Sequence, residues 1–291
     1  MPNNTFDSRI FAGTMTWGSW GKRFSKTEMA GLIEYCLELG INVFDHADIY
    51  GGYTTEADFG AAFVDSRIPR ENIQLISKCG IQLDAPKRRN RVKHYDYSKD
   101  HIIRSVEQSL KNLNTDYLDM LLLHRPSPLM QPEEIGGAVE TLKAQGKVRA
   151  FGVSNFLPAQ IALLETTVAV EGNQIEFSLT QNAALSDGSL HDCMAKGRTA
   201  MSWSPLGVYF KEDNKMTRRI EKHLDPMLEK YDATADQLLL AWILKHPSDV
   251  HPVVGTTTKS RLATAMEAVK IDLDMEDWFI LLEAAKGAEV A

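Results

Sequence analysis

Three short, mainly apolar segments of this chain each end in an ionisable side chain, and this pattern constrains the fold more than any other feature. The segments are Ile41–Phe44, Ile73–Ser77 and Leu118–Leu123. Runs of this length are typical of strands buried in a parallel sheet. The carboxyl ends of parallel strands lie at one edge of the sheet, so the side chains that follow them are predicted to meet there. These side chains are Asp45 with Tyr50 in the next loop, Lys78, and His124.

Strand-like apolar runs and helix-like amphipathic runs alternate along the whole chain. Five further strands are expected at Arg9–Gly13, Val148–Val153, Asn173–Glu176, Ala200–Trp203 and Pro252–Val254. Helices are expected at Lys26–Leu39, Thr55–Val64, Lys99–Asn112, Pro132–Gln145, Pro158–Thr167, Asp236–Lys245, Lys259–Ala268 and Asp277–Lys286. With a weaker unit at Asp187–Lys196, this makes eight strand–helix units. Such alternation implies a parallel sheet.

Eight units favour closure of the sheet, and we predict an α/β fold, a single (β/α)8 TIM barrel domain over residues 1–291. A doubly wound open sheet is the competing architecture. The sequence lacks the G-x-G-x-x-G fingerprint of that fold and the P-loop pattern. The longest stretches without a predicted element are Gly80–Tyr97 and Leu206–Thr217. Both follow strands, so both are predicted to lie on the face that carries the ionisable side chains.

The sequence also marks where the first helix begins and ends. Ser25 is suited to the N-cap position, and Glu28 three residues later would complete a capping box. Gly40 follows the helix as a C-terminal stop.

Composition excludes several classes of protein. The formal net charge of −7 argues against a nucleic-acid surface or a polybasic membrane anchor. Cys36, Cys79 and Cys193 are widely spaced and form no C-x-x-C pair, so neither a zinc site nor a disulfide framework is predicted. Residues 1–11 lack the pattern of a secretory signal, and no apolar run approaches the ~20 residues of a membrane span. We therefore expect a cytoplasmic protein with reduced thiols.

The ionisable set suits proton transfer to a carbonyl oxygen. A tyrosine is a weak acid because its pKa is about 10, and a nearby lysine ammonium would lower that pKa. Asp45 is expected to hold Lys78 in its charged form, and His124 to donate a hydrogen bond to a substrate oxygen. No side chain in the set is an evident nucleophile. A hydride from a reduced nicotinamide is therefore the natural group to add to the carbonyl carbon.

Other interpretations of these residues stay open at this point. Lys78 could form a Schiff base with a carbonyl substrate, as in barrel aldolases. Asp45 and Lys78 could instead be a structural ion pair, and His124 could cap a strand. A metal site within residues 45–48 is disfavoured, and no metal is predicted. The basic run Lys87–Arg91 is predicted to be a solvated loop, with attraction of an anionic substrate as the alternative.

The order of short motifs along the chain resembles the aldo-keto reductase superfamily. The matching segments are Asp45–Gly51, Ser77–Gly80, Leu122–His124, Gly152–Phe156, Asn173–Glu176 and Trp203–Gly207. Each motif is short, but the ordered set is specific, and the similarity runs from about Gly13 to the final helix. The chain differs from the residues usual in the family at four positions, which are His46, Arg125, Gly255 and Ala265.

The resemblance implies a reductase of aldehydes or ketones. It implies that Tyr50 is the general acid, that Asp45 and Lys78 tune it, and that His124 orients the carbonyl. The expected partner is a small-molecule carbonyl compound, with no nucleic acid and no membrane. The oligomeric state is not predicted. The rival within this fold is a protein that binds NADPH as a regulatory ligand with little turnover.

The resemblance also implies NADPH as the cofactor. The residues that it assigns to cofactor contacts are Gly13, Thr14, Met15, Asp45, Ser154, Asn155, Gln174, Trp203, Ser204, Pro205, Leu206, Val254, Gly255, Thr256, Thr257, Lys259 and Arg261. Ser154, Asn155 and Gln174 would bond the nicotinamide amide, and Trp203 would stack on the ring. The threonine hydroxyls lie at a predicted helix start, which favours anions. The cations Lys259 and Arg261 favour NADPH over NADH.

Two tryptophans flank the loop after the first strand. Trp17 and Trp20 are predicted to line the substrate pocket together with Tyr50 and His124. The alternative for both tryptophans is that they cover the rim of the barrel.

Overall fold

The computed structural model describes residues 6–86 and 88–290 of the chain, and its centre is a closed barrel of eight parallel strands. The strands are β1 (Phe11–Gly13), β2 (Val43–Asp45), β3 (Gln74–Cys79), β6 (Leu118–Leu123), β7 (Val148–Ser154), β8 (Gly172–Glu176), β9 (Thr199–Trp203) and β10 (His251–Val254). They neighbour one another in the order β1-β10-β9-β8-β7-β6-β3-β2, and β2 pairs with β1 to close the ring. The predicted (β/α)8 TIM barrel is confirmed, and the open doubly wound sheet is excluded.

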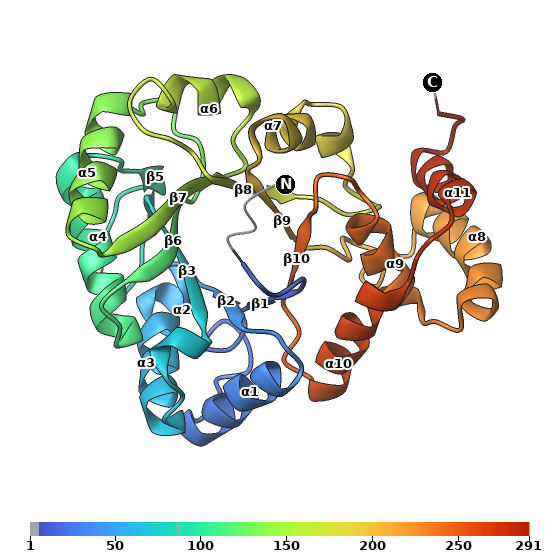
Figure 1. The fold of residues 1–291 in the computed structure, drawn as a ribbon, viewed down its shortest axis with the longest axis horizontal. Helices are drawn as coiled ribbons and strands as arrows, with labels where there is room; N and C mark the ends of the chain where they lie inside the picture. The colour runs from blue at the N-terminus through green and yellow to red at the C-terminus, as the bar shows by residue number, and fades with distance from the viewer. Residues whose placement is uncertain (1–5, 87, 291) are drawn as a thin grey trace.

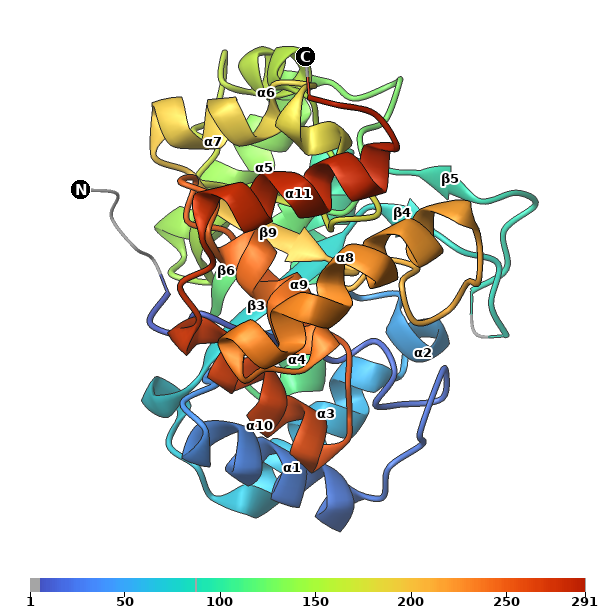
Figure 2. The ribbon, with the colours of Figure 1, turned by 90° about the vertical axis from the view of Figure 1, so that its right-hand side faces the viewer.

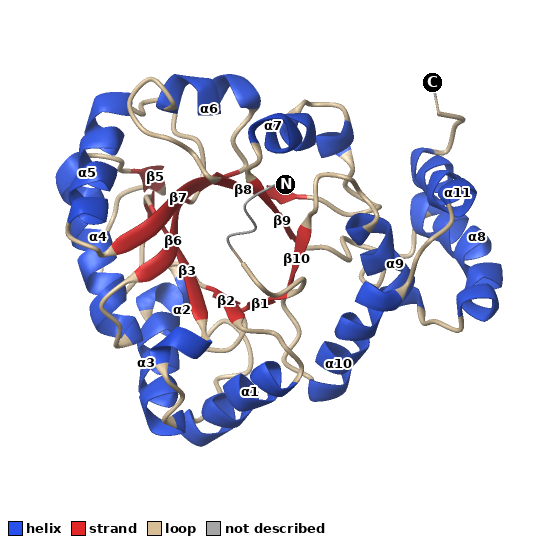
Figure 3. Cartoon of the chain, in the orientation of Figure 1, coloured by secondary structure: helices blue, strands red, loops and turns tan. Residues whose placement is uncertain are grey.

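Helices surround the barrel on its outside (Figures 1 and 3). Those between or after the strands are α1 (Lys26–Glu38), α3 (Thr55–Ser66), α4 (Lys99–Leu113), α5 (Pro132–Ala144), α6 (Pro158–Leu164), α7 (Ser189–Lys196), α9 (Ala235–Leu244) and α10 (Lys259–Glu267). Two more, α8 (Lys215–Tyr231) and α11 (Met275–Lys286), pack against each other at the periphery, on the right in Figure 1.

The predicted caps of the first helix are present in the structure. The Glu28 backbone N–H donates to Ser25 Oγ at 3.3 Å, and the Ser25 backbone N–H donates to Glu28 Oε2 at 2.9 Å. This reciprocal capping box satisfies two donors that the first turn leaves without helical partners. Gly40 has a φ of +79°, a left-handed conformation that a glycine adopts without strain.

The core has an inner and an outer layer because successive strand residues point to opposite faces of the sheet. Inside the barrel lie Phe6, Phe11, Val43, Ile76, Met120, Leu122, Ala150, Met201 and Val253. On β6, the intervening Leu121 and Leu123 belong instead to the outer layer between strands and helices. The inner layer therefore decides which residues of each strand face the barrel interior, and this sets the direction of the side chains at the strand ends.

Helix α8 was not predicted from the sequence. Its apolar residues Ile220, Leu224 and Met227 recur at helical spacing and are buried. Asn214 caps the helix by accepting hydrogen bonds from the backbone N–H groups of residues 216 and 217. Pro226 lies within the helix, and a proline in a helix interior removes a backbone donor and normally ends the element. In this case burial of the apolar side chains outweighs that local signal.

The stretch predicted to be irregular after β3 contains a small antiparallel hairpin. Its strands are β4 (Ile81–Gln82) and β5 (His94–Tyr95). Figure 2 shows the hairpin on the same side of the barrel as α2 (Tyr50–Tyr53). Gly80 enters the hairpin with a φ of +108°, and a Cβ atom there would lie 1.9 Å from the Tyr97 ring. Only glycine therefore fits where the chain leaves the barrel.

Two helical glycines provide a matched test of helix packing. A Cβ atom on Gly60 of α3 would lie 2.0 Å from the Asn112 carbonyl oxygen of α4, whereas one on Gly31 of α1 would meet nothing within 4 Å. We predict that Gly60→Ala lowers the free energy of unfolding by about 1–3 kcal/mol through overpacking. Gly31→Ala should raise it by up to about 1 kcal/mol, because alanine is the better helix former. Urea unfolding measures both, and equal effects of the two substitutions would contradict this account.

Candidate active site

Three of the predicted site residues point into the mouth of the barrel for the same reason. Asp45, Lys78 and His124 each lie two residues after an inward-facing core residue, so the alternation of strand side chains aims them inward. The inward-facing core residues that precede them are Val43, Ile76 and Leu122.

The Lys78 ammonium is at the centre of the site. It donates to both carboxylate oxygens of Asp45 at 2.7 and 2.8 Å, and to the His46 backbone carbonyl at 2.7 Å. It also donates to the Tyr50 hydroxyl at 3.3 Å. Lys78 is only 1% exposed. An ammonium has three N–H donors, and the aspartate, the carbonyl and the phenol provide an acceptor for each.

These contacts keep Lys78 charged. Burial alone would lower its pKa, but the Asp45 carboxylate and the bonds to it reverse the effect, so that the pKa of Lys78 is raised. A Schiff base forms only on a neutral amine, and this amine has its protons engaged in a buried network. The geometry therefore disfavours Lys78 as a covalent nucleophile.

Burial controls the acidity of Tyr50. Desolvation raises the pKa of its phenol, and the neighbouring Lys78 ammonium acts in the opposite direction. The net shift is upward, so the predicted lowering by Lys78 is outweighed by burial in the structure without a ligand. The phenol is thus protonated and able to donate a hydrogen bond at neutral pH.

His124 completes the group as a neutral imidazole. Burial, with contributions from Lys78 and Arg125, lowers its pKa well below the usual value. Its ring lies edge-on to the Tyr50 ring, with 6.1 Å between the centroids. The buried His124 Nδ1 has no hydrogen-bond partner among the described residues. A neutral imidazole can donate a hydrogen bond to a substrate oxygen without adding a positive charge.

A strained turn carries Tyr50, which begins the short helix α2 instead of lying in a loop. Gly51, Gly52 and Tyr53 have φ values of +63°, +65° and +72°. Such backbone conformations are costly for a residue with a side chain and concentrate at functional sites. The Tyr53 hydroxyl accepts from the Leu83 backbone N–H at 2.9 Å, which ties the β4–β5 hairpin to the turn.

The basic run in the loop between β4 and β5 is only partly solvated. Lys87 lies outside the described residues. The Arg88 guanidinium stacks over the Tyr53 ring, with its Cζ atom 4.1 Å from the centroid. The Arg89 side chain is 80% exposed, as predicted for a solvated loop.

A second network lies beside the first, at the ends of β7, β8 and β9. Gln174 donates from Nε2 to Asp45 Oδ1 at 2.8 Å, and Ser154 donates to the Gln174 backbone carbonyl at 2.9 Å. Asn155 Oδ1 accepts from Trp203 Nε1 at 2.9 Å. Asn155 also has a left-handed φ of +59°. These four residues, all predicted to bind the nicotinamide, are therefore held in one connected group that reaches the Asp45 carboxylate.

The loop after β1 closes the other side of the site. The Thr14 hydroxyl contacts the Asp45 carbonyl at 3.0 Å and His46 Nδ1 at 2.8 Å, so it is engaged internally. Met15 is 47% exposed. A side chain at Gly13 would crowd Val253, because its Cβ atom would lie 3.1 Å from the valine methyl group.

The predicted phosphate segment leads into α10. The backbone N–H of Thr258 donates to Thr256 Oγ1 at 3.3 Å, and Thr257 lies between them. Lys259 is placed over the Tyr35 ring, with Nζ 4.8 Å from the centroid. Arg261 is exposed and forms no ion pair with any residue that the structure describes. Both predicted cations are exposed and without an ion pair among the described residues, and Arg261 also lacks a ring contact of the kind that Lys259 makes.

The remaining predicted contacts lie in two adjacent segments. Ser204 has a φ of +53°, and its carbonyl accepts from the Gly207 N–H at 2.8 Å, so a tight turn holds Pro205 and Leu206. Val254 is the last residue of β10, and the carbonyl of Gly255 accepts from the Thr16 hydroxyl at 3.1 Å.

The two tryptophans of the first loop have different environments. Trp17 is fully buried and packs edge-on against Phe44 at 6.1 Å and near Phe59 at the same distance. The structure thus places Trp17 in the outer core, and its assignment to the substrate pocket is wrong. Trp20 is 46% exposed, with its ring 6.2 Å from that of Tyr50, at the rim of the site.

Two contributors to the site were not identified as such from the sequence. The His46 backbone carbonyl binds Lys78. A main-chain contact of this kind cannot be predicted from the residue type. Arg125 donates to Ser154 Oγ at 3.0 Å, and its signals were its position directly after His124 and its departure from the residue usual in the family.

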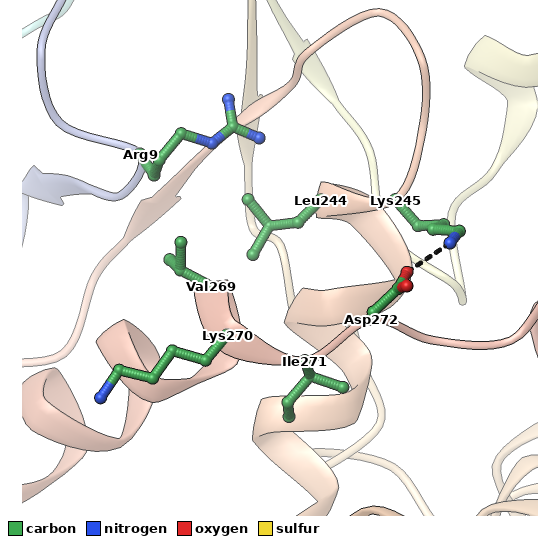
Figure 4. Close-up of a pocket in the computed structure, with 7 residues that line it drawn as sticks. All are labelled: Arg9, Leu244, Lys245, Val269, Lys270, Ile271 and Asp272. Carbon is green, nitrogen blue, oxygen red and sulfur yellow. Dashed lines mark hydrogen bonds and ion pairs between the residues drawn. The ribbon is translucent and has the colours of Figure 1, made fainter.

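A separate cavity of about 240 Å³ lies at the opposite end of the barrel, near the start of β1 and the end of α9 (Figure 4). It is lined by Arg9, Leu244, Lys245, Val269, Lys270, Ile271 and Asp272. Its cations are paired within the protein, Arg9 with Asp249, Lys245 with Asp272 and Lys270 with Glu267.

In the part of the chain that the structure describes, no helix has the length and apolar character needed to cross a membrane.

The Lys78–Asp45 pair should contribute to stability as well as to chemistry. We predict that Asp45→Asn lowers the free energy of unfolding by about 3 kcal/mol at pH 7, because it leaves a buried ammonium without its counter-ion. Asp213→Asn, which breaks the fully exposed pair with Arg218, is the control and should change little. Urea unfolding measures both, and equal losses would contradict the prediction.

The pH dependence tests the same pair. A raised folded-state pKa means that the Lys78 contribution is fully present below the unfolded lysine pKa of about 10.4 and is lost only above it. In Asp45→Asn, burial lowers the pKa of Lys78, so the variant should regain stability relative to the wild type between pH 7 and pH 9.5. A gap that widens over this range would contradict the assignment.

Comparison with known proteins gives the family. Residues 9–286 match the model of the Aldo/keto reductase family. The chain is 43% identical to the uncharacterized oxidoreductase YcsN of Bacillus subtilis, over 97% of this chain and 96% of that one. It is 40% identical to a 6-dehydroglucose reductase of Agrobacterium fabrum, over 92% and 91% of the two chains. A crystal structure of an aldo/keto reductase from Klebsiella pneumoniae, in complex with NADP and acetate, has a TM-score of 0.76 at 26% identity, over 92% and 88%. The chain therefore belongs to the aldo/keto reductase family.

Proposed function

We propose that this protein is an NADPH-dependent reductase of aldehydes or ketones with Tyr50 as the general acid. The observation that carries the proposal is the position of the Tyr50 hydroxyl 3.3 Å from a buried Lys78 ammonium, which Asp45 keeps charged. The presence of NADP in the Klebsiella pneumoniae relative supports the choice of cofactor.

The free polar atoms of the second network fit a nicotinamide carboxamide. Among the described residues, Asn155 Nδ2 and Gln174 Oε1 have no partner, whereas Asn155 Oδ1 and Gln174 Nε2 are engaged. Asn155 is thus left with a donor for the amide oxygen and Gln174 with an acceptor for the amide nitrogen. Trp203 lies beside them with its indole N–H fixed. When bound, NADPH supplies the hydride for the carbonyl carbon.

The chain's own residues act on the substrate oxygen. Tyr50 and the neutral His124 both donate hydrogen bonds to it, which favours negative charge on the oxygen. Tyr50 then transfers its proton to that oxygen, and Lys78 stabilises the phenolate left behind. Gln174 and Lys78 together hold the Asp45 carboxylate in place. Sugar-derived aldehydes are the first substrates to test, given the name of the Agrobacterium fabrum relative.

Removal of the phenolic hydroxyl tests the general acid. We predict that Tyr50→Phe lowers kcat for carbonyl reduction about 10²–10⁴-fold while the Kd for NADPH stays nearly unchanged, because the hydroxyl acts on the substrate. NADPH consumption and fluorescence titration measure the two quantities. Tyr117→Phe is the matched control, since Tyr117 stacks between Arg70 and Arg149 and makes no contact with the site residues. Undiminished turnover in Tyr50→Phe would exclude the assigned role.

Charge removal at α10 tests the choice of cofactor. We predict that Arg261→Ala weakens NADPH binding by about 10–100-fold, as expected for loss of one charge-assisted bond to a phosphate. NADH binding should change far less, because NADH lacks that phosphate. Arg104→Ala on α4 removes an exposed arginine on another part of the barrel and serves as the control. Equal loss of affinity for both cofactors would show that Arg261 does not bind the phosphate.

A further inference from the structure

We propose that Arg125 is a specificity-determining residue that selects carbonyl substrates with an oxygen acceptor, a hydroxyl or a carboxylate, on the carbon next to the carbonyl. This inference rests on the proposed reductase function and names the substrate class of the same site.

The backbone of Arg125 is held rigidly. The Tyr97 hydroxyl donates to the Arg125 carbonyl at 2.6 Å and accepts from the Arg125 N–H at 3.1 Å. Tyr97 itself packs against Gly80 at the start of the β4–β5 hairpin. One side chain therefore satisfies both backbone groups of Arg125 and fixes the residue directly after His124. An arginine whose backbone is fixed in this way loses less freedom when a ligand binds.

The guanidinium lies between the two networks of the site. Its Nη1 donates to the His124 carbonyl at 2.6 Å and to Ser154 Oγ at 3.0 Å. Its Cζ atom is 5.3 Å from the centroid of the Trp203 ring. It is also close enough to Tyr50 for the two groups to influence each other electrostatically. The side chain thus lies beside both the substrate-oxygen donors and the proposed nicotinamide contacts.

Most of the hydrogen-bonding capacity of this guanidinium is unused. A guanidinium has five N–H donors, and only Nη1 has partners among the described residues. Arg125 forms no ion pair with any described carboxylate, although it is half-buried. Burial lowers the pKa of Arg125, which shows that the charge is held at a cost in solvation. Oxygen acceptors on a bound molecule would offset that cost.

The balance of charge gives the sign of the expected ligand group. Asp45 compensates Lys78, and His124 is neutral. Glu176 acts on Arg125 electrostatically but forms no ion pair with it, so the Arg125 guanidinium is left without a directly bonded carboxylate among the described residues. A planar guanidinium binds carboxylates and pairs of hydroxyl oxygens through parallel N–H donors. The carbonyl oxygen of the substrate is expected at Tyr50 and His124, so the group that meets Arg125 lies on an adjacent carbon. Alpha-hydroxy aldehydes and 2-oxo acids have this arrangement.

The test compares three small carbonyl compounds in the presence of NADPH. Propanal has no second acceptor, glyceraldehyde has an adjacent hydroxyl, and glyoxylate has an adjacent carboxylate. For the wild type, Arg125→Met and Arg125→Lys, we measure kcat/KM for each compound. The ratio to propanal cancels any change in cofactor binding, which is common to all three substrates. Arg89→Met, which removes an exposed arginine of the neighbouring loop, is the matched control.

We expect Arg125→Met to lower the glyceraldehyde-to-propanal or the glyoxylate-to-propanal ratio by about 10–100-fold, the loss of one or two bonds to a charged donor. Arg125→Lys should retain part of the preference, and Arg89→Met all of it. The larger of the two losses identifies the acceptor as hydroxyl or carboxylate. Equal losses for all three compounds would mean a structural role for Arg125 and would overturn the proposal, as would ratios that change less than twofold.

A binding measurement separates this inference from the proposed function. If the wild type consumes no NADPH with any carbonyl compound, the reductase assignment fails. Calorimetric titration of glycolate, which carries both acceptors, then tests Arg125 without turnover. Binding to the wild type that is lost in Arg125→Met supports the assignment. Equal binding to both proteins, or binding to neither, overturns it.

Discussion

The buried ion pair between Lys78 and Asp45 is the interaction on which the site depends. An ammonium and a carboxylate taken out of water lose a large solvation energy, and such a pair is tolerated only when its geometry and extra hydrogen bonds compensate. Here the His46 carbonyl, the Tyr50 hydroxyl and the Gln174 amide provide those bonds. The same contacts that make the pair tolerable also place a charged ammonium beside a phenol. Stability and chemistry therefore share one set of atoms.

The barrel makes this arrangement possible because it separates an apolar interior from a polar mouth. Residues such as Ile76 and Leu122 fill the interior and so decide which residues of their strands face inward. Two positions further along, the same inward direction leads to the mouth, where Lys78 and His124 lie. The register Lys78 to Leu122 sets how far each strand extends beyond its neighbour. A change of one residue in that register would turn the polar side chain away from the site.

The two cations of the site have different environments, and this difference suggests different tasks. Lys78 is fully buried, and each of its donors has an acceptor within the protein, so it acts on neighbouring groups such as Tyr50 and His124 and leaves no donor for a ligand. Arg125 is half-buried, has unused donors and forms no ion pair among the described residues. A cation whose partners are all internal tunes its neighbours, whereas one with unused donors can select among ligands. In the proposed reductase, Lys78 supports a reaction common to many carbonyl compounds, and Arg125 selects among those compounds.

Local patterns in the sequence were sufficient to predict the barrel and the convergence of four side chains, Asp45, Tyr50, Lys78 and His124. Apolar runs of strand length, their alternation with helices and the residue type at each strand end are all encoded within a few neighbouring positions. Local patterns failed where burial outweighed a local signal. Helix α8, which contains Pro226, was not predicted, yet the apolar face of that helix is buried against its neighbours. Trp17 was assigned to the pocket, yet the space between Phe44 and Phe59 takes it into the core.

The remaining features arise from contacts between segments distant in sequence, and only the tertiary structure decided them. The upward shift of the Tyr50 pKa reflects how completely the folded chain excludes water, which no motif states. The role of the His46 carbonyl is a property of the backbone path and is independent of residue type. The position of the unused donors of Arg125 depends on a tyrosine 28 positions earlier that fixes its backbone. Residue types determined which chemistry was available to this protein, and the packing of distant segments decided which charges are compensated and which are left for a ligand.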